Sequence, residues 1–271
     1  MAYIDINGNE YNNLEDITED AVVDEIDFSN IGFPELPRKL ATITVKKLNL
    51  HQCMGLTSLS GLPKGLEELS CSACHKLTSL KGLPKGLKML SCWSTYITSL
   101  EDCPEGLEEL RCDFCTKLTS LKGLTQGLKR LTCVGTHITS LEGLPNSLER
   151  LECGSTAITS LKGLPKGLKE LDCEFCSEII SLEGLPQGLK VLKCRRTAIT
   201  SLGSVPRGIK SINCEECYKL KYIPDYIPDE VIEGLSKMKI DECRANWKKE
   251  QERKKALEQQ RAAITKRFMG R

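Results

Sequence analysis

The sequence lacks any apolar run that approaches the length of a membrane-spanning helix. Such a helix needs about 20 consecutive apolar residues, and the 271 residues contain no such stretch. The N-terminus, MAYIDINGNE, also lacks the basic and apolar regions of a secretory signal. Fifteen cysteines without such a signal indicate reduced thiols. We therefore expect no membrane span and a cytoplasmic location, which is a host cytoplasm if the protein is viral or a secreted effector.

Histidine is scarce, and no arrangement typical of a catalytic site is present. The three histidines are His51, His75 and His137, and none is paired with a nucleophile in a known motif. We therefore expect a non-enzymatic protein without catalytic residues.

Basic residues are missing from the first 37 positions, which hold ten Asp or Glu. Residues 237–271 hold twelve Lys or Arg against five Asp or Glu, although the whole chain is nearly balanced, with 38 basic and 37 acidic residues. Solvated chain ends are the usual explanation of this asymmetry, and a charged interaction segment is the alternative.

The chain is dominated by a repeated segment of 20 or 21 residues. Residues 128–147 read LKRLTCVGTHITSLEGLPNS, and the next copy reads LERLECGSTAITSLKGLPKG. The copies open at Val45, Leu66, Leu87, Leu107, Leu128, Leu148, Leu168, Leu189 and Ile209. A short fixed period predicts a solenoid, in which each turn packs only against its neighbours.

The repeat resembles the leucine-rich repeat, whose core pattern is L-x-x-L-x-L-x-x-(N/C)-x-L. Its ending L-P-x-G-L is similar to the short class found in secreted bacterial effectors and in giant-virus leucine-rich repeat proteins. Cysteine replaces the third leucine in eight copies, and cysteine or threonine replaces the asparagine. The resemblance implies an α/β fold by convention that is mostly β in content: a right-handed parallel-β solenoid, or horseshoe, with an extended convex side and a C-terminal helix.

Before the repeats, we expect an N-terminal cap at residues 1–44. Tyr3–Tyr11 contains Asn-Gly between alternating apolar positions, which predicts a hairpin. We expect a short helix at Glu15–Asp24 and a degenerate first turn at Val23–Thr44.

Nine repeats are expected over residues 45–223. After them we expect a C-terminal cap at residues 224–247, with a helix that starts near Glu230 and is capped by Asp229. Residues 248–271 are strongly helical by propensity and mostly polar, so we expect a charged helical tail.

Within each repeat, L-x-x-L-x-C predicts a short strand whose alternate residues face inward. Successive strands should be parallel and about 4.8 Å apart. The segment T-S-L-x-G-L-P-x-G is too rich in Gly and Pro for a helix, so it should be extended. We expect six of the glycines that end this segment to adopt backbone conformations that other residues avoid. These glycines are Gly86, Gly106, Gly127, Gly167, Gly188 and Gly208.

Four C-x-x-C pairs raise the alternatives of zinc binding and thiol redox chemistry. They are Cys71/Cys74, Cys112/Cys115, Cys173/Cys176 and Cys214/Cys217. Both cysteines of each pair occupy inward positions of the repeat, and the pairs never fall in adjacent turns. We therefore expect cysteine to act as a small buried hydrophobe, with no metal and no cofactor.

Two outward columns of charge alternate in sign from turn to turn. The first is Glu67, Lys88, Glu108, Lys129, Glu149, Lys169, Lys190 and Lys210, in which the last two lysines break the alternation, and the second, on the convex side, is Lys81, Glu101, Lys122, Glu142, Lys162 and Glu183. Because adjacent turns stack at strand spacing, we expect each charge to face an opposite one. Each ion pair contributes only about 0–1 kcal/mol to stability. Together the pairs disfavour a shift of the strand register by one turn, which would bring like charges together.

We expect a monomeric protein-interaction scaffold that binds a protein partner on the concave sheet face. This expectation rests on analogy with the fold. Large aromatic residues near the strand ends are either buried and packed beneath the turn, or exposed and able to contact a partner protein. The candidate partner-binding residues are Trp93, Glu109, Arg111, Phe114, Arg130, Arg150, Phe175, Lys193, Arg195 and Arg196.

Two other functions remain open. One is a substrate-targeting subunit in ubiquitin transfer, or a host-pathway effector. Some bacterial relatives carry a ubiquitin-ligase domain after the repeats, but only about fifty residues follow them here, too few for that domain. The other is a binder of an acidic ligand or nucleic acid through the basic cluster near Arg195 and the basic tail. The alternating charges elsewhere make nucleic acid unlikely, since it requires a continuous basic stripe.

Overall fold

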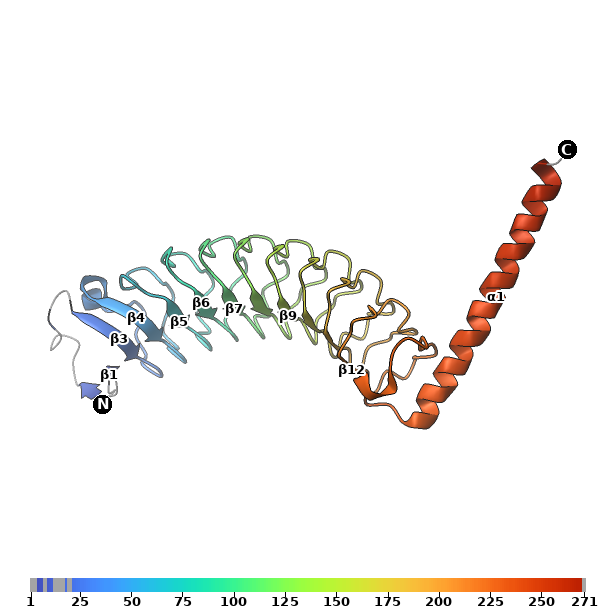
Figure 1. Cartoon of the computed structure of the whole chain (residues 1–271). Coiled ribbons are helices and arrows are strands. Elements are labelled where there is room, and N and C mark those ends of the chain that lie inside the picture. Colours follow the sequence, from blue (N-terminus) through green and yellow to red (C-terminus); the bar gives the residue numbers. More distant parts are fainter. Residues whose placement is uncertain (1–3, 7–8, 12–17, 19–20, 270–271) are drawn as a thin grey trace.

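The computed structural model describes residues 4–6, 9–11, 18 and 21–269, with side chains from 263 onward left out. These residues form one 13-stranded sheet in the order β13-β12-β11-β10-β9-β8-β7-β6-β5-β4-β3-β1-β2. From β3 to β13 every neighbouring pair is parallel. Figure 1 shows an arch, with strands along its inner side and one helix at its C-terminal end. The expected parallel-β solenoid with a C-terminal helix is therefore confirmed.

From β5 to β12 each strand has only three residues before the chain bends, whereas β3 and β4 have six and β13 has two. They are β3 (Val22–Asp27), β4 (Thr44–Asn49), β5 (Glu68–Ser70), β6 (Met89–Ser91), β7 (Glu109–Arg111), β8 (Arg130–Thr132), β9 (Arg150–Glu152), β10 (Glu170–Asp172), β11 (Val191–Lys193), β12 (Ser211–Asn213) and β13 (Ile232–Glu233).

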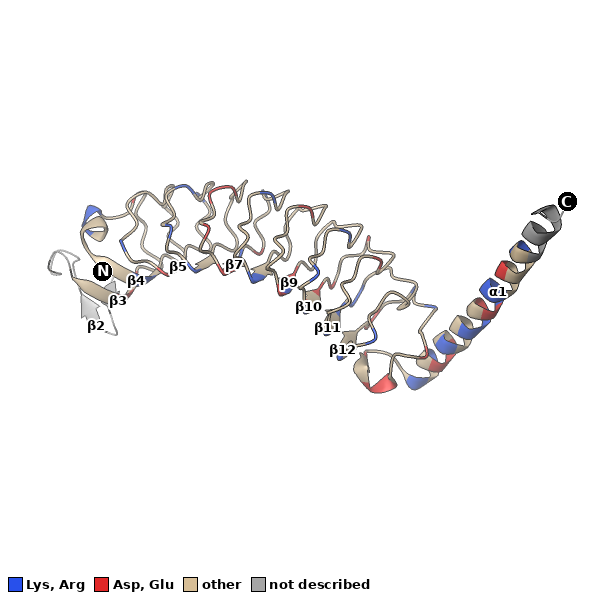
Figure 2. Ribbon diagram, turned by 45° about the horizontal axis from the view of Figure 1, so that its top comes forward, with Lys and Arg blue, Asp and Glu red and all other residues tan. Residues whose placement is uncertain are grey.

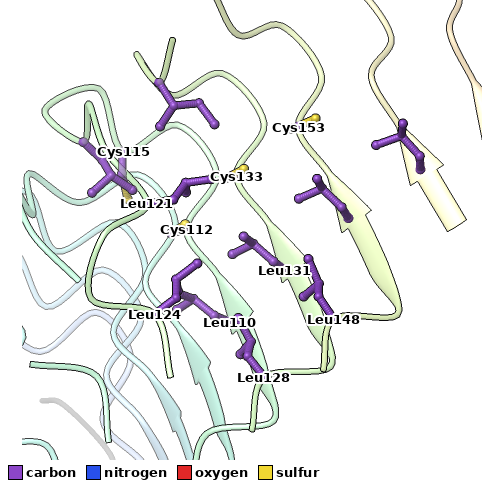
Figure 3. Close-up of a cluster of buried hydrophobic side chains, with 14 of the residues drawn as sticks. Leu110, Cys112, Cys115, Leu121, Leu124, Leu128, Leu131, Cys133, Leu148 and Cys153 are labelled. Carbon is purple, nitrogen blue, oxygen red and sulfur yellow. The ribbon is translucent and has the colours of Figure 1, made fainter. Parts of the chain in front are cut away.

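The core is a set of columns that run through all turns. The central leucine of each strand pairs in register with its equivalent in the next turn, as Leu110 does with Leu131 and Leu131 with Leu151. Figure 3 shows these leucines and the cysteines that follow them pointing into the interior. Leu131 and Cys133 are fully buried. Each turn therefore buries its apolar residues only against the turns on either side.

The glycines that adopt left-handed backbone conformations are not the ones we expected. None of the six expected glycines has a positive φ, whereas the glycine of L-x-G-L does, as at Gly82 (φ 102°) and Gly184 (φ 102°). A Cβ on Gly184 would lie 2.8 Å from the carbonyl oxygen of Leu161 in the preceding turn. Both the conformation and the close approach of two backbones therefore require glycine at this position.

A serine hydroxyl closes the convex turn. The Oγ of Ser79 accepts a hydrogen bond from the backbone N–H of Lys81 (3.1 Å), and Ser120 and Ser160 make the same bond (3.2 Å) two residues on. This local bond satisfies a backbone donor that has no ladder partner. It explains the serine of T-S-L and keeps the convex side extended without a helix.

At the N-terminus, β1 (Ile4–Ile6) pairs antiparallel with β2 (Asn9–Tyr11), as the Asn-Gly pattern predicted. The helix expected over Glu15–Asp24 is wrong for its last three residues, which begin β3. Residues 15–17, 19 and 20 lie outside the described part. Val23 and Ile26 are buried in β3, and β3 pairs in parallel register with β4. Their apolar spacing overrides the local helix signal.

At the C-terminus, the helix begins later than expected. Asp229–Val231 form a 3₁₀ turn, β13 follows, and the helix α1 spans Lys237–Met269 without a break. The boundary that we expected at residue 247 therefore falls within one helix. Ile240 and Cys243 are buried against the last turn, whereas residues 252–262 are exposed on every side. No helix in the described part of the chain combines the length and the apolar character needed to cross a bilayer.

Candidate functional site

Each strand presents two outward side chains on the inner side of the arch. The first and third residues of β7 are Glu109 and Arg111, and those of β8 are Arg130 and Thr132. Because the strands are in register, these residues form two columns across the sheet. Figure 2 shows that residues of both charge signs lie along the strands. We call this surface the concave face.

Glu109 is the buried charge at the centre of the concave face. Only 5% of its surface is exposed, and its carboxylate accepts hydrogen bonds from Arg111 Nε (2.7 Å) and Arg130 Nε (2.5 Å). Burial alone raises the pKa of a carboxyl group. In Glu109 the two arginines outweigh burial, so its pKa lies below the ordinary value. This carboxylate therefore fixes two guanidinium groups that remain half exposed to solvent.

Arg150 continues this arrangement into the next turns. Its guanidinium binds Glu152 Oε1 through Nη2 (2.7 Å) and Glu170 Oε2 through Nη1 (2.8 Å). On the opposite side, Asp113 accepts hydrogen bonds from the Thr132 hydroxyl and the Val134 backbone N–H, both 2.8 Å. Arg111, Arg130 and Arg150 thus border a shallow depression whose floor is Leu131 and Thr132. The sequence predicted that the three arginines lie on the concave face. That Asp113 and Glu170 lie near them follows only from the strand register.

A second depression lies on the concave face nearer the N-terminus. Lys47, Glu68, Ser70, Met89 and Ser91 border it, together with Glu25, Ser29, Asn49 and His51. It is bordered by fewer charged residues than the depression beside Arg111, Arg130 and Arg150, so the density of charge changes along the concave face.

The structure places the three candidate aromatics at the surface. Trp93 is 39% exposed, Phe114 56% and Phe175 41%. They lie in the turn that follows each strand, so they are not filler beneath it. Phe114 and Phe175 have φ of 56° and 62°, a left-handed conformation that is uncommon for bulky residues. Equivalent positions in other turns hold Ser94, Gly135 and Ser155 with similar φ, so the turn imposes this geometry.

Three residues of the basic cluster near the C-terminal end of the sheet are paired with acidic groups. Lys193 lies 3.4 Å from Asp172, and Arg195 binds Glu215 and Glu216. Arg196 also binds Glu216 (2.6 Å). Hydrogen bonds from these two arginines lower the pKa of Glu216 to about 2. Lys193, Arg195 and Arg196 therefore do not form an unbroken basic stripe of the kind that nucleic acids require.

The first charge column behaves as expected, and the second does not. Glu67 and Lys88, Glu108 and Lys129, and Glu149 and Lys169 each approach to 2.8 Å. On the convex side, no ion pair within the described residues joins two members of the column from Lys81 to Glu183. The outer turns of the arch lie farther apart than the strands on its inner side, and the charged residues of the second column are all exposed.

All fifteen cysteines are free and buried. Within the described part of the chain, no three His, Cys, Asp or Glu side chains are grouped so that they could hold a metal ion. The second thiol of a pair instead bonds to the preceding turn, as Cys115 Sγ does to the carbonyl oxygen of Cys92 (3.1 Å). In turns without that thiol, Thr136 donates to the carbonyl oxygen of Cys133 (2.7 Å). Cysteine and threonine therefore have the same structural task of satisfying a buried carbonyl group.

The comparisons with known proteins agree with this architecture. YopM from Yersinia enterocolitica is similar with 28% identity and a TM-score of 0.52, over 70% of this chain and 46% of that chain. The matched region is thus less than half of YopM. An internalin, InlF, from Listeria monocytogenes has 17% identity and a TM-score of 0.52, over 82% of this chain and 86% of that chain. No family model and no curated protein matches the chain.

Both solved structures are leucine-rich repeat proteins, and no catalytic family is indicated by the comparisons. A scaffold that takes part in protein interactions is compatible with both of them. With turns of about 21 residues, parallel strands from β3 to β13 and these structural relatives, the solenoid fits the short class of leucine-rich repeat proteins.

Proposed function

We propose that the protein is a non-enzymatic scaffold that binds a protein partner on its concave face. The observation that carries this proposal is the buried Glu109, which holds Arg111 and Arg130 beside a shallow depression. Prearranged arginines with half-exposed guanidinium groups suit a protein partner, since arginine is enriched among residues that dominate binding energy. Holding them in place before binding reduces the entropy lost on association.

The mixed charge of the concave face supports a protein partner over a polyanion. Arg111, Arg130 and Arg150 are each bonded to a carboxylate. A partner with a complementary pattern of both signs would gain discrimination from this surface. Binding of nucleic acid through the C-terminal basic cluster is disfavoured by the pairing of Arg195 and Arg196 with Glu216.

The test compares matched double variants of the full chain. Arg150→Ala with Lys193→Ala removes two positive charges from the concave face, and Lys122→Ala with Lys162→Ala removes two from the convex side. Neither double variant touches the buried Glu109. Each protein is immobilised at equal folded concentration, and proteins captured from lysate of its native cells are quantified by mass spectrometry.

We expect the captured amount of at least one protein to fall at least tenfold with the concave variant. The captured amount of that protein should stay unchanged with the convex variant. Loss of the same proteins with the convex variant, or full capture by the concave variant, would contradict the proposal.

We also propose that the protein works as a monomer in a reducing compartment such as the cytoplasm. Fifteen buried free thiols support the reducing compartment, because disulfides form readily only under oxidising conditions. Analytical ultracentrifugation of the reduced protein would measure its mass in solution and so test whether it is a monomer.

A further inference from the structure

Exposed aromatic and apolar side chains gather on one edge of the solenoid, where the concave face meets the turns. Met54, Trp93, Tyr96 and Phe114 are exposed there, in four successive turns that also contain His51 and His75. We call these six residues the aromatic rim. Isolated exposed apolar residues are ordinary on protein surfaces, but a contiguous group marks an interaction site.

The rings of the aromatic rim are arranged in pairs. His51 and Trp93 have ring centroids 5.5 Å apart at an interplanar angle of 39°. His75 and Tyr96 are 6.0 Å apart at 38°. Ser72 lies in the turn between His51 and Trp93 and is fully buried, so the two rings meet over a small residue. The result is a row of similarly tilted rings, without bulky side chains between them.

Two polar groups of the rim have no hydrogen-bond partner among the described residues. Among the hydrogen bonds of the described residues, none involves the Trp93 indole N–H or the Tyr96 hydroxyl. Both side chains are exposed, so these donors are available to a bound molecule.

The aromatic rim carries little charge in its first three turns, and in its fourth Phe114 lies between Asp113 and Lys117. The segments 51–55 and 93–97 contain no Asp, Glu, Lys or Arg, and the segment 72–76 contains only Lys76. The equivalent turns near the C-terminus, in contrast, contain Glu174, Arg195, Arg196, Glu215 and Glu216. An uncharged surface complements an uncharged ligand, so the rim does not suit an acidic peptide or a nucleic acid.

We propose that the aromatic rim binds an extended, proline-rich segment of a partner protein. A polyproline II helix exposes all its backbone carbonyl groups because it has no internal hydrogen bonds. Such segments pack their rings into aromatic-lined surfaces and accept hydrogen bonds from them. The tilted rings of Trp93 and Tyr96 provide the packing surface, and their N–H and O–H groups provide the donors.

The spacing of the turns supports this choice of ligand. Residues i and i+3 of a polyproline II helix recur after about 9.3 Å. Two solenoid turns cover about 9.6 Å at strand spacing. Met54 and Tyr96 occupy the same position of turns that are two apart, and His75 lies between them. Prolines on one side of the ligand can therefore contact alternate turns along the rim.

The inference deepens the proposed function, on which it rests, because the rim adjoins the concave face. His51 borders the N-terminal depression of that face, and its ring also contacts Trp93. One partner could thus place a folded part on the concave face and a proline-rich segment on the rim.

The test is selection of peptides from an unbiased library. Random 12-residue peptides are displayed and selected on the immobilised full chain, and the enriched sequences are synthesised for titration by fluorescence anisotropy. We expect enrichment of peptides with two prolines three residues apart. Trp93→Ala with Tyr96→Ala should weaken their binding at least tenfold, and Trp93→Phe, which keeps a ring but removes the donor, should cause a smaller loss.

Tyr218→Ala is the matched control, because Tyr218 is an exposed tyrosine at the position of Tyr96 in a distant turn. It should change the Kd less than twofold, and circular dichroism should show every variant folded. The Arg150→Ala, Lys193→Ala variant should bind the selected peptides normally, so failure of the rim is distinguishable from failure of the concave face. Enrichment of acidic or helix-forming peptides, equal binding by the rim variant, or no enrichment would overturn the inference.

Discussion

At the scale of single residues, Glu109 shows how a buried charge can organise a surface. Its folded pKa lies below the ordinary value of 4.5 because the hydrogen bonds from Arg130 and Arg111 outweigh burial. A carboxyl group with a lowered folded pKa adds stability that is complete above its unfolded pKa. That stability is lost as pH falls through the folded pKa.

We predict that Glu109→Gln destabilises the fold by about 1–3 kcal/mol at pH 7, since charged hydrogen bonds are lost in a buried place. The difference from the wild type should shrink as pH falls below 4.5, because Glu109 of the unfolded wild type then takes up a proton that the folded carboxylate takes up only at lower pH. Urea denaturation at pH 7, 5 and 3 measures both effects. Glu152→Gln is the control, and it should have a smaller effect because its partner Arg150 keeps Glu170. A pH-independent difference would show that the charge of Glu109 is not responsible.

The buried thiols lead to a second prediction at this scale. Burial raises the pKa of most of them, as at Cys103, where it reaches about 12. A hydrogen bond with Cys92 instead lowers the pKa of Cys115 to about 7, although Cys115 is also buried. Because none of the fifteen is exposed, we predict slow reaction with a thiol reagent in the native state and fifteen reactive thiols after denaturation. Metal analysis of protein purified without chelator should find less than one zinc per chain, and stoichiometric zinc would refute the packing role.

At the scale of one turn, the fold depends on leucines that meet only their counterparts in adjacent turns. Leu131 is fully buried between Leu110 and Leu151. We predict that Leu131→Ala lowers the free energy of unfolding by about 2–5 kcal/mol, as is typical of buried leucine truncations. Thr132→Ala, in the next position but facing outward, should cost less than about 1 kcal/mol. Chemical denaturation measures both, and a loss below about 1 kcal/mol for Leu131→Ala would contradict its central position in the turn.

The same turn explains what could be predicted from the sequence. The leucine and cysteine columns were predictable because inward positions tolerate few residue types, so the period is visible. The position with a left-handed backbone in the turn after each strand was not predictable. It holds residues as different as Gly135, Phe114 and Arg196, which share only a backbone geometry. The candidate site was predicted in part. Arg111 and Arg130 were expected on the concave face, but the burial of Glu109 and the ring pairs of the aromatic rim depend on contacts between turns.

At the scale of the whole molecule, the solenoid has two ends that need covering, and α1 covers one of them. Only its first part does so: Trp247 lies against Gly203, and Asn246 donates to the carbonyl oxygen of Lys221 (3.4 Å). Residues 252–262 are exposed all round, and a helix that is polar on every side gains little from packing. We infer that the later part of α1 does not support the repeats.

We therefore predict that deleting residues 254–271 changes the free energy of unfolding by less than about 0.5 kcal/mol, as for surface changes in general. Trp247→Ala should destabilise the protein by at least about 1 kcal/mol, because terminal turns of a solenoid need a cap. Urea denaturation compares the two with the full chain. The deletion leaves Arg253 and its ion pair with Glu250 in place, so it isolates the projecting residues. If the deletion were as damaging as Trp247→Ala, the last eighteen residues would be part of the cap, and the fold would depend on the entire helix.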